Sequence, residues 1–179
     1  HIPHILNTRG LTGEGAEVGV SSGEFSELLL TYWKGRRLYS IDPWLHVPGD
    51  VYLDSANSVQ SVQDYRYTET VVKLSRFGER SKIMRLTSTE AATHIPDGSL
   101  DFVYIDAQHH YEAVKQDIAA WFPKVKKGGL LCGHDYLDGM KNGSIFGVKQ
   151  AVDEFVKERG FRLILTMEND YRSWLVFVR

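Results

Sequence analysis

The feature that most constrains this chain is a short apolar strand running into a glycine-containing turn, Glu17-Val-Gly-Val-Ser-Ser-Gly23. After the turn, apolar residues change from strand spacing to helical spacing, at Phe25, Leu28, Leu29 and Tyr32. Glycine lets the backbone turn sharply and lets a ligand approach without meeting a side chain. The segment therefore predicts a strand, a ligand-binding turn and a helix.

Two carboxylates near this turn indicate the charge of the ligand. Glu17 would repel a phosphate, which such turns otherwise hold through backbone N–H groups and a helix N-terminus. The spacing also departs from the Gly-x-Gly-x-x-Gly dinucleotide pattern, so a nicotinamide cofactor is disfavoured. A second predicted strand, Arg37 to Ile41, ends at Asp42, where nucleotide-binding α/β folds place an acid for the ribose hydroxyls. An adenosine that carries a positive group fits both acids.

Further polar residues follow the other predicted strands. Asp106 follows the strand 101–105, and His134 and Asp135 follow the strand 130–133. Because ligands bind beyond the carboxyl ends of the strands in open α/β sheets, these side chains should meet at one edge. The alternation of strands and helices predicts an α/β fold, a Rossmann-like doubly wound sheet of seven strands. The sheet should be mostly parallel, with an antiparallel last strand.

At this point the chain resembles a known family. The segments 17–23, Asp42 and 100–106 look like the first, second and fourth motifs of class I S-adenosylmethionine-dependent methyltransferases. The segments 106–114 and 127–136 are similar to a bacterial branch, the small O-methyltransferase-like domains related to macrocin O-methyltransferase. The resemblance implies one methyltransferase domain over 1–179 and O-methylation of a small molecule, such as a sugar or secondary metabolite. The expected cofactor-binding residues are Glu17, Gly19, Ser21, Gly23, Asp42, Ser88, Thr89 and Asp106.

Two segments keep two interpretations each. Ser88 and Thr89 could flank the adenine, as the equivalent loop does in the resembling proteins, or could simply cap a helix. The long stretch from Trp44 to Tyr52 is a candidate for acceptor recognition, because structureless insertions often serve as binding loops. Its aromatic residues could equally be hydrophobic cover. Residues 1–12, which include Pro3 and Gly10, are expected to be irregular, and residues 137–143 are expected to form a turn-rich loop. The run from Tyr111 to Val125 is expected to be an amphipathic helix.

Methyl transfer to a hydroxyl requires that the hydroxyl lose its proton. Ionising a phenol of pKa about 10 at neutral pH costs roughly 4 kcal/mol. A general base or a divalent metal ion can remove that cost. His109 is the predicted base, with His110 as the alternative, and Asp106 is its predicted catalytic partner. Asp106 and Asp135, with His134 as a further ligand, could also hold Mg2+ or another divalent metal, as in the resembling metal-dependent O-methyltransferases; His134 would suit manganese, iron or zinc better than magnesium. Alternatively, His134 and Asp135 form an ordinary hydrogen-bond network at the strand end.

Composition limits the remaining classes of function. The net charge of −2 gives no electrostatic case for nucleic acid or an anionic membrane. Cys132 is the only cysteine and lies in an apolar strand, so a structural thiol, and neither a disulfide nor a four-ligand zinc site, is expected. The expected location is cytoplasmic, and the expected partners are a small-molecule acceptor and a second copy in a homodimer. The alternative function is a non-catalytic S-adenosylmethionine-binding module.

Overall fold

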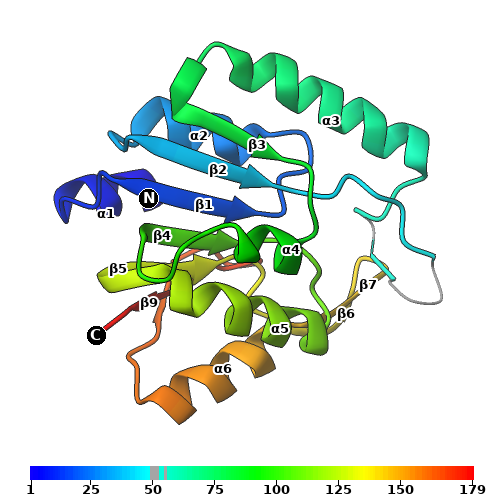
Figure 1. Ribbon diagram of the computed structural model, residues 1–179. Helices are drawn as coiled ribbons and strands as arrows, with labels where there is room; N and C mark the ends of the chain where they lie inside the picture. Colours follow the sequence, from blue (N-terminus) through cyan, green and yellow to red (C-terminus); the bar gives the residue numbers. More distant parts are fainter. Residues whose placement is uncertain (49–52, 55) are drawn as a thin grey trace.

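The computed structural model of the chain describes residues 1–48, 53–54 and 56–179. Its main sheet has seven strands in the order β3-β2-β1-β4-β5-β9-β8 (Figure 1). The neighbouring pairs among β1 to β5 are parallel, and β9 is antiparallel to both β5 and β8. The predicted doubly wound sheet with a reversed last strand is therefore confirmed. The strands are β1 (Glu14–Val18), β2 (Arg37–Ile41), β3 (Ser81–Met84), β4 (Leu100–Ile105), β5 (Val125–Gly133), β8 (Ile164–Leu165) and β9 (Trp174–Phe177).

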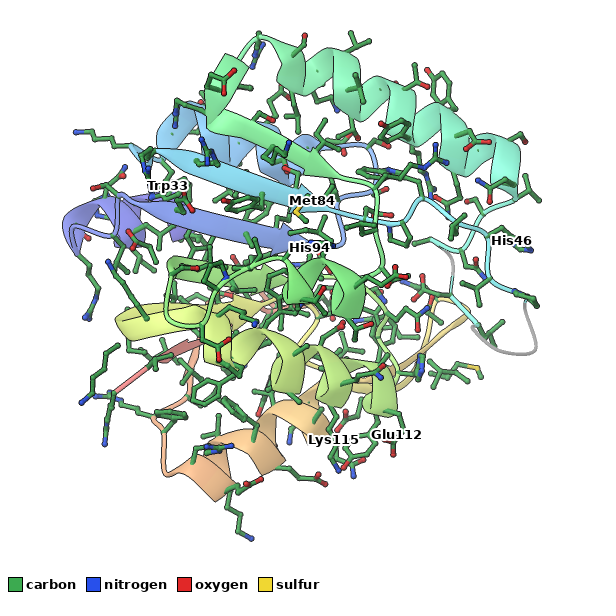
Figure 2. All side chains as sticks on the ribbon, viewed as in Figure 1. Trp33, His46, Met84, His94, Glu112 and Lys115 are labelled. Carbon is green, nitrogen blue, oxygen red and sulfur yellow. The ribbon has the colours of Figure 1, made fainter. Side chains whose placement is uncertain are left out.

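Helices cover both faces of this sheet (Figure 1). One apolar cluster joins one face of the sheet to α4, α5 and α6, through residues such as Val103, Ile118 and Val152. The other joins the opposite face to α1, α2 and α3, through residues such as Phe102 and Leu30. On the outer side of the molecule, charged side chains of α5 are exposed (Figure 2). The helices are α1 (Ile2–Thr8), α2 (Glu24–Tyr32), α3 (Gln60–Ser75), α4 (Ser88–Thr93), α5 (Tyr111–Trp121) and α6 (Val148–Arg159), with short 3-10 turns η1 (Gly78–Arg80) and η2 (Phe122–Lys124).

The register of the central strands sets the level of the residues that follow them. Val18 of β1 pairs with Ile41 of β2 and with Ile105 of β4, and Ile105 pairs with Gly133 of β5. The next residues in each strand's direction therefore leave the sheet at one edge. These residues are Gly19, Asp42, Asp106 and His134, which the sequence predicted to converge.

Three local predictions were wrong. Residues 1–12 are not irregular throughout, because α1 spans Ile2–Thr8 and buries Ile2 and Leu6. Proline at a helix start is tolerated, since its missing N–H would have no intrahelical partner there, so Pro3 does not break the helix. Val125 does not belong to the preceding helix: α5 ends at Trp121, and Val125 begins β5. Pro123 has no N–H to donate to the preceding turn, so the α-helical hydrogen bonding is not continued there, and η2 separates α5 from β5.

The third correction concerns the stretch after β5, which was expected to be a loop. It contains a hairpin of β6 (Asp138–Lys141) and β7 (Ser144–Gly147). The two-residue turn between them is Asn142-Gly143, and both residues have a positive φ, of 51° and 80°. This is the conformation that asparagine and glycine favour in tight hairpins. Elsewhere, Cys132 is buried as predicted. None of the helices among the described residues combines the length and the apolar character required to cross a bilayer.

Candidate functional site

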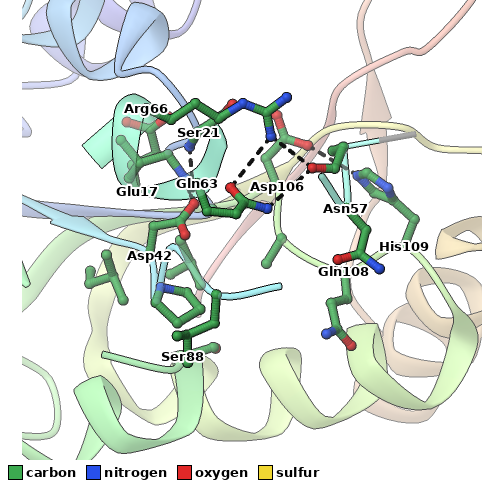
Figure 3. Close-up of a pocket in the computed structure, with 18 of the residues that line it drawn as sticks. Glu17, Ser21, Asp42, Asn57, Gln63, Arg66, Ser88, Asp106, Gln108 and His109 are labelled. Atoms are coloured by element: carbon green, nitrogen blue, oxygen red, sulfur yellow. Dashed lines mark hydrogen bonds and ion pairs between the residues drawn. The ribbon is translucent and has the colours of Figure 1, made fainter. Parts of the chain in front are cut away.

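A cavity of about 360 Å³ lies at the edge where β1, β2 and β4 end (Figure 3). Its walls include Glu17, Gly19, Ser21, Asp42, Ser88, Asp106 and His109, all of which the sequence singled out. Gly23 and Thr89 are not among the lining residues. Gly23 instead caps the start of α2 and approaches Thr70 of α3. The structure thus brings most of the predicted cofactor residues to one place, in a volume typical of small-molecule sites.

Asp42 holds the turn that follows β1. Its Oδ2 accepts hydrogen bonds from the backbone N–H groups of Val20, at 2.9 Å, and Ser21, at 3.0 Å. Its Oδ1 accepts one from the backbone of Trp44, at 2.7 Å. Gly19 has a φ of +91°, and a Cβ there would lie 2.0 Å from the carbonyl oxygen of Asp106. Only glycine therefore allows the turn to pass this close to the end of β4.

The side chain of Glu17 is buried and hydrogen-bonded, which its position in the sequence did not indicate. Its side chain is 2% exposed, and Ser26 donates a hydrogen bond to it. Burial raises the pKa of Glu17 well above its usual range, against the opposing effect of the Ser26 hydrogen bond. A carboxyl with such a raised pKa carries less negative charge than a free one. The electrostatic role assigned to Glu17 from the sequence is weakened, although the residue does line the cavity.

Ser88 belongs both to the cavity wall and to a helix start. Thr87, rather than Ser88, is the N-cap of α4, and it forms a capping box with Glu90. The hydroxyl of Ser88 donates to Asp117 and accepts a hydrogen bond from the indole of Trp121, at 2.9 Å. Both the capping and the cavity-lining interpretations of this loop therefore have a structural basis. The O–H of Ser88 is already used by Asp117, so its hydroxyl could serve a ligand only as an acceptor.

We expect Asp117→Asn to change how stability depends on pH. Burial, partly opposed by the Ser88 hydrogen bond, raises the pKa of Asp117 to about 6. Its protonated form therefore favours the native state below the unfolded pKa of about 4, and this contribution is lost as the pH rises through about 6. Asparagine carries no charge to bury. Relative to the wild type, the variant should gain up to about 3 kcal/mol between about pH 4 and pH 8.

Urea unfolding at several pH values measures this difference. The amide oxygen of asparagine can still accept the Ser88 hydrogen bond, which keeps the comparison clean. Asp97→Asn is the control, because Asp97 is exposed and pairs with Lys124 at the surface. A variant whose stability follows the wild-type pH profile would show that Asp117 is not the buried titrating group.

Asp106, His134 and Asp135 form a cluster beside the cavity. Each offers one ligand atom, and these atoms lie within 4.8 Å of one another. His134 Nδ1 is 3.0 Å from Asp135 Oδ1 and 4.0 Å from Asp106 Oδ2. Burial lowers the pKa of His134, but Asp135 and Asp106 outweigh it and raise that pKa. Asp135 is 7% exposed with a φ of 53°, a conformation that aspartate tolerates better than most residues.

His109 lies between three carboxylates. Its Nδ1 is 2.7 Å from Asp54 Oδ2, and its Nε2 is 3.1 Å from Asp135 Oδ2 and 3.4 Å from Asp106 Oδ1. Burial lowers the pKa of His109, but the hydrogen bonds to Asp106 and Asp54 outweigh it and raise that pKa to about 10. An imidazolium can donate a proton but cannot accept one. The base role predicted for His109 therefore requires that the surrounding negative charge be offset by something bound.

Several residues of this site could not be recognised as site residues from the sequence. Asp54 comes from the long loop after β2, and Arg66 and Gln63 come from α3. Trp44, from the same loop, is fully buried and donates its indole N–H to the carbonyl of Ser21, so it holds the turn. Tyr52, which the sequence placed in this loop, lies outside the described residues.

A second cavity, of about 330 Å³, shares part of the same centre. Asp106 and Phe25 line both cavities, and His134 lines the second. The ring of Tyr104 packs against Phe25, with 4.3 Å between centroids, and its hydroxyl is 3.2 Å from Ser173 Oγ. Two ligands could thus approach Asp106 through separate cavities. That arrangement suits a reaction in which a group passes from one bound molecule to another.

Comparison with known proteins supports this interpretation of the fold. A family model described as a methyltransferase domain matches residues 16–136. The uncharacterized protein y4gI of Sinorhizobium fredii is 26% identical over 132 residues, which are 74% of this chain. The chain spans only 14% of the length of that curated relative.

Two solved structures are similar in fold. An O-methyltransferase from Bacillus cereus, in complex with S-adenosylhomocysteine, matches with a TM-score of 0.63 and 13% identity. The match covers 98% of this chain and 78% of that one. A 1,6-didemethyltoxoflavin-N1-methyltransferase from Burkholderia thailandensis matches with a TM-score of 0.64 and 13% identity, over 97% of this chain and 75% of that one. At this level of identity, the likeness shows the shared fold.

Proposed function

Because the chain belongs to this methyltransferase domain family, we propose that it is an S-adenosylmethionine-dependent methyltransferase that methylates an oxygen of a small molecule. The observation that carries this proposal is the cavity, which joins the glycine turn and Asp42 to Asp106. Asp106 in turn belongs to the cluster with His134 and Asp135. A cofactor site and a centre that could activate a hydroxyl are therefore neighbours. Residues 1–179 would form one such domain.

The cavity suits an extended adenosine derivative. In Figure 3, Ser88 lies at one end and Arg66 at the other, with Asp42 between them. We place the adenine beside Ser88 and the ribose hydroxyls at Asp42, as expected from the sequence. The sulfonium would then lie towards Asp106. In the reaction the acceptor oxygen bonds to the methyl carbon, the carbon–sulfur bond breaks, and the acceptor proton is lost.

The proton could be handled in two ways at this centre. Asp106, Asp135 and His134 have the donor atoms of a divalent-cation site, two carboxylates and one imidazole nitrogen. A divalent cation there would supply Lewis-acid activation of the acceptor hydroxyl. His109, whose Nε2 faces both Asp106 and Asp135, remains the predicted group to hold the proton. A sugar or secondary metabolite as acceptor, a homodimer and a cytoplasmic location remain predictions from the sequence.

Calorimetry with S-adenosylhomocysteine tests the proposal. We expect micromolar binding to the wild type, and NADH, as a control nucleotide, should bind far more weakly. No detectable heat at millimolar S-adenosylhomocysteine would contradict the proposal. Cofactor binding without methyl transfer to any member of a broad panel of phenols, sugars and secondary metabolites, with or without divalent cations, would instead favour the non-catalytic module.

A further inference from the structure

One face of α3 is docked on the turn that follows β1. Thr70 donates its hydroxyl to the carbonyl of Ser21, at 3.1 Å, and Lys73 donates to the carbonyl of Ser22, at 2.7 Å. Arg66 lies one helical turn before Thr70, on the same face. The contacts of Thr70 and Lys73 fix this face against the turn. Arg66 is thereby brought to the cavity that the turn encloses.

Arg66 reaches this cavity with donors to spare. Its Nη1 donates to the carbonyl of Ala56, at 2.7 Å, and to Gln63 Oε1, at 3.4 Å. Its Nε and Nη2 have no hydrogen bond to another residue in the described part of the chain. Figure 3 shows the side chain extended across the cavity above Gln63. The guanidinium is therefore anchored on one side and open on the other.

Arg66 differs in charge from the acidic residues that line the cavity. Four carboxyl groups line it, from Glu17, Glu24, Asp42 and Asp106. Among the described lining residues, Arg66 is the only lysine or arginine. Glu24, Asp42 and Asp106 would repel an anionic group of a ligand. Among the described lining residues, Arg66 alone offers a planar, permanently charged partner for a carboxylate.

We propose that Arg66 binds the carboxylate of the methionine part of S-adenosylmethionine. This inference rests on the proposed function, because it assumes that this cofactor occupies the cavity. With the adenine beside Ser88 and the ribose at Asp42, the amino-acid end points towards Arg66. Arg66 then selects a cofactor that carries an amino acid over a nucleoside that lacks one. It also holds the carbonyl of Ala56, two residues from the Asp54 that contacts His109.

A purely structural role for Arg66 predicts something different. If the guanidinium only tethers the loop through Ala56, its loss should weaken every adenosine ligand to the same degree. If it binds the carboxylate, the loss should depend on whether the ligand has one. The two roles are separated by a ligand that lacks only this group.

The experiment measures binding of two ligands by calorimetry to the wild type and to three variants. The ligands are S-adenosylhomocysteine and its decarboxylated form, which keeps the amine. Arg66→Gln should weaken S-adenosylhomocysteine about 10- to 100-fold, as expected for a charged hydrogen bond, and the decarboxylated form less than about 3-fold. Arg66→Lys should lie between the wild type and Arg66→Gln, because lysine keeps the charge but not the planar pair of donors.

Arg85→Gln is the matched control. Arg85 pairs with Asp64 on the exposed side of α3 and does not line the cavity, so this variant should bind both ligands like the wild type. Equal losses for both ligands in Arg66→Gln, or none for S-adenosylhomocysteine, would overturn the inference while leaving the proposed function in place. A wild type that binds neither ligand would overturn both.

Discussion

Asp42→Ala is expected to weaken binding of S-adenosylhomocysteine at least about 100-fold. The variant loses the carboxylate that accepts from the backbone of Val20 and Ser21, and it also loses the predicted partner of the ribose hydroxyls. Each hydrogen bond to a charged group is worth about 1.5 to 3 kcal/mol, and about 2.7 kcal/mol corresponds to 100-fold in affinity. Calorimetry with wild type and variant gives the ratio directly.

Two further variants sharpen this test. Asp42→Asn keeps one acceptor oxygen and should lose less affinity than Asp42→Ala. Asp97→Ala removes an exposed carboxylate far from the cavity and should bind like the wild type. Thermal unfolding without ligand shows how much of the loss comes from a loosened turn. Unchanged affinity in Asp42→Ala would mean that the cofactor does not lie along this edge of the sheet.

The second large effect is expected from Asp135→Asn, as a loss of divalent-cation binding. Asp135 is almost fully buried and lies 3.0 Å from His134 and 3.1 Å from His109. Removing its charge should weaken Mn2+ binding at least about 100-fold, since even residues that only support ligands change metal affinity about 10- to 100-fold. Asparagine tolerates the positive φ of this position, which alanine would not. Electron paramagnetic resonance of Mn2+ titrations measures the loss.

The same variant should leave cofactor binding almost intact. S-adenosylhomocysteine affinity should change less than about 3-fold, because Asp135 does not line the cofactor cavity. Asp138→Asn is the control: this exposed residue of β6 caps a backbone N–H of α6 and takes no part in the cluster. A wild type that binds no Mn2+ would remove the metal interpretation. Equal losses of Mn2+ and cofactor in Asp135→Asn would show that the two functions are not divided as proposed.

The central part of the fold could be predicted because its signals are local. β2 was predicted with its observed ends, since the apolar run from Arg37 is stopped by Asp42-Pro43. The convergence of Asp42, Asp106 and His134 followed from one rule about parallel strands. The β6–β7 hairpin was missed although Asn142-Gly143 is itself a local hairpin signal. α1 was missed because Pro3 was taken as a sign of irregular chain.

The rest of the site depends on contacts between distant segments. Arg66 faces the cavity only because α3 docks on the glycine turn through Thr70 and Lys73. Asp54 contacts His109 across 55 residues of sequence. Burial raises the pKa of Glu17; at His109 burial lowers the pKa, but the neighbouring carboxylates outweigh it and raise that pKa. No pattern of residue types in the sequence records either environment. Sequence spacing locates the edge of the sheet, but tertiary packing decides which side chains reach it.

The β6–β7 hairpin also bears on how such domains diverge. It begins at Asp138, just beyond the part of the chain that matches the family model. Nevertheless it touches the candidate centre: the backbone of Gly147 donates to the carbonyl of His109, and the ring of Phe146 stacks on His109 at 5.1 Å. Exchanging this ten-residue hairpin between relatives would alter the surroundings of His109 while sparing β1, β2 and β4, whose ends border the cavity. A hairpin graft is therefore a way to vary the candidate centre without changing the sheet that carries it.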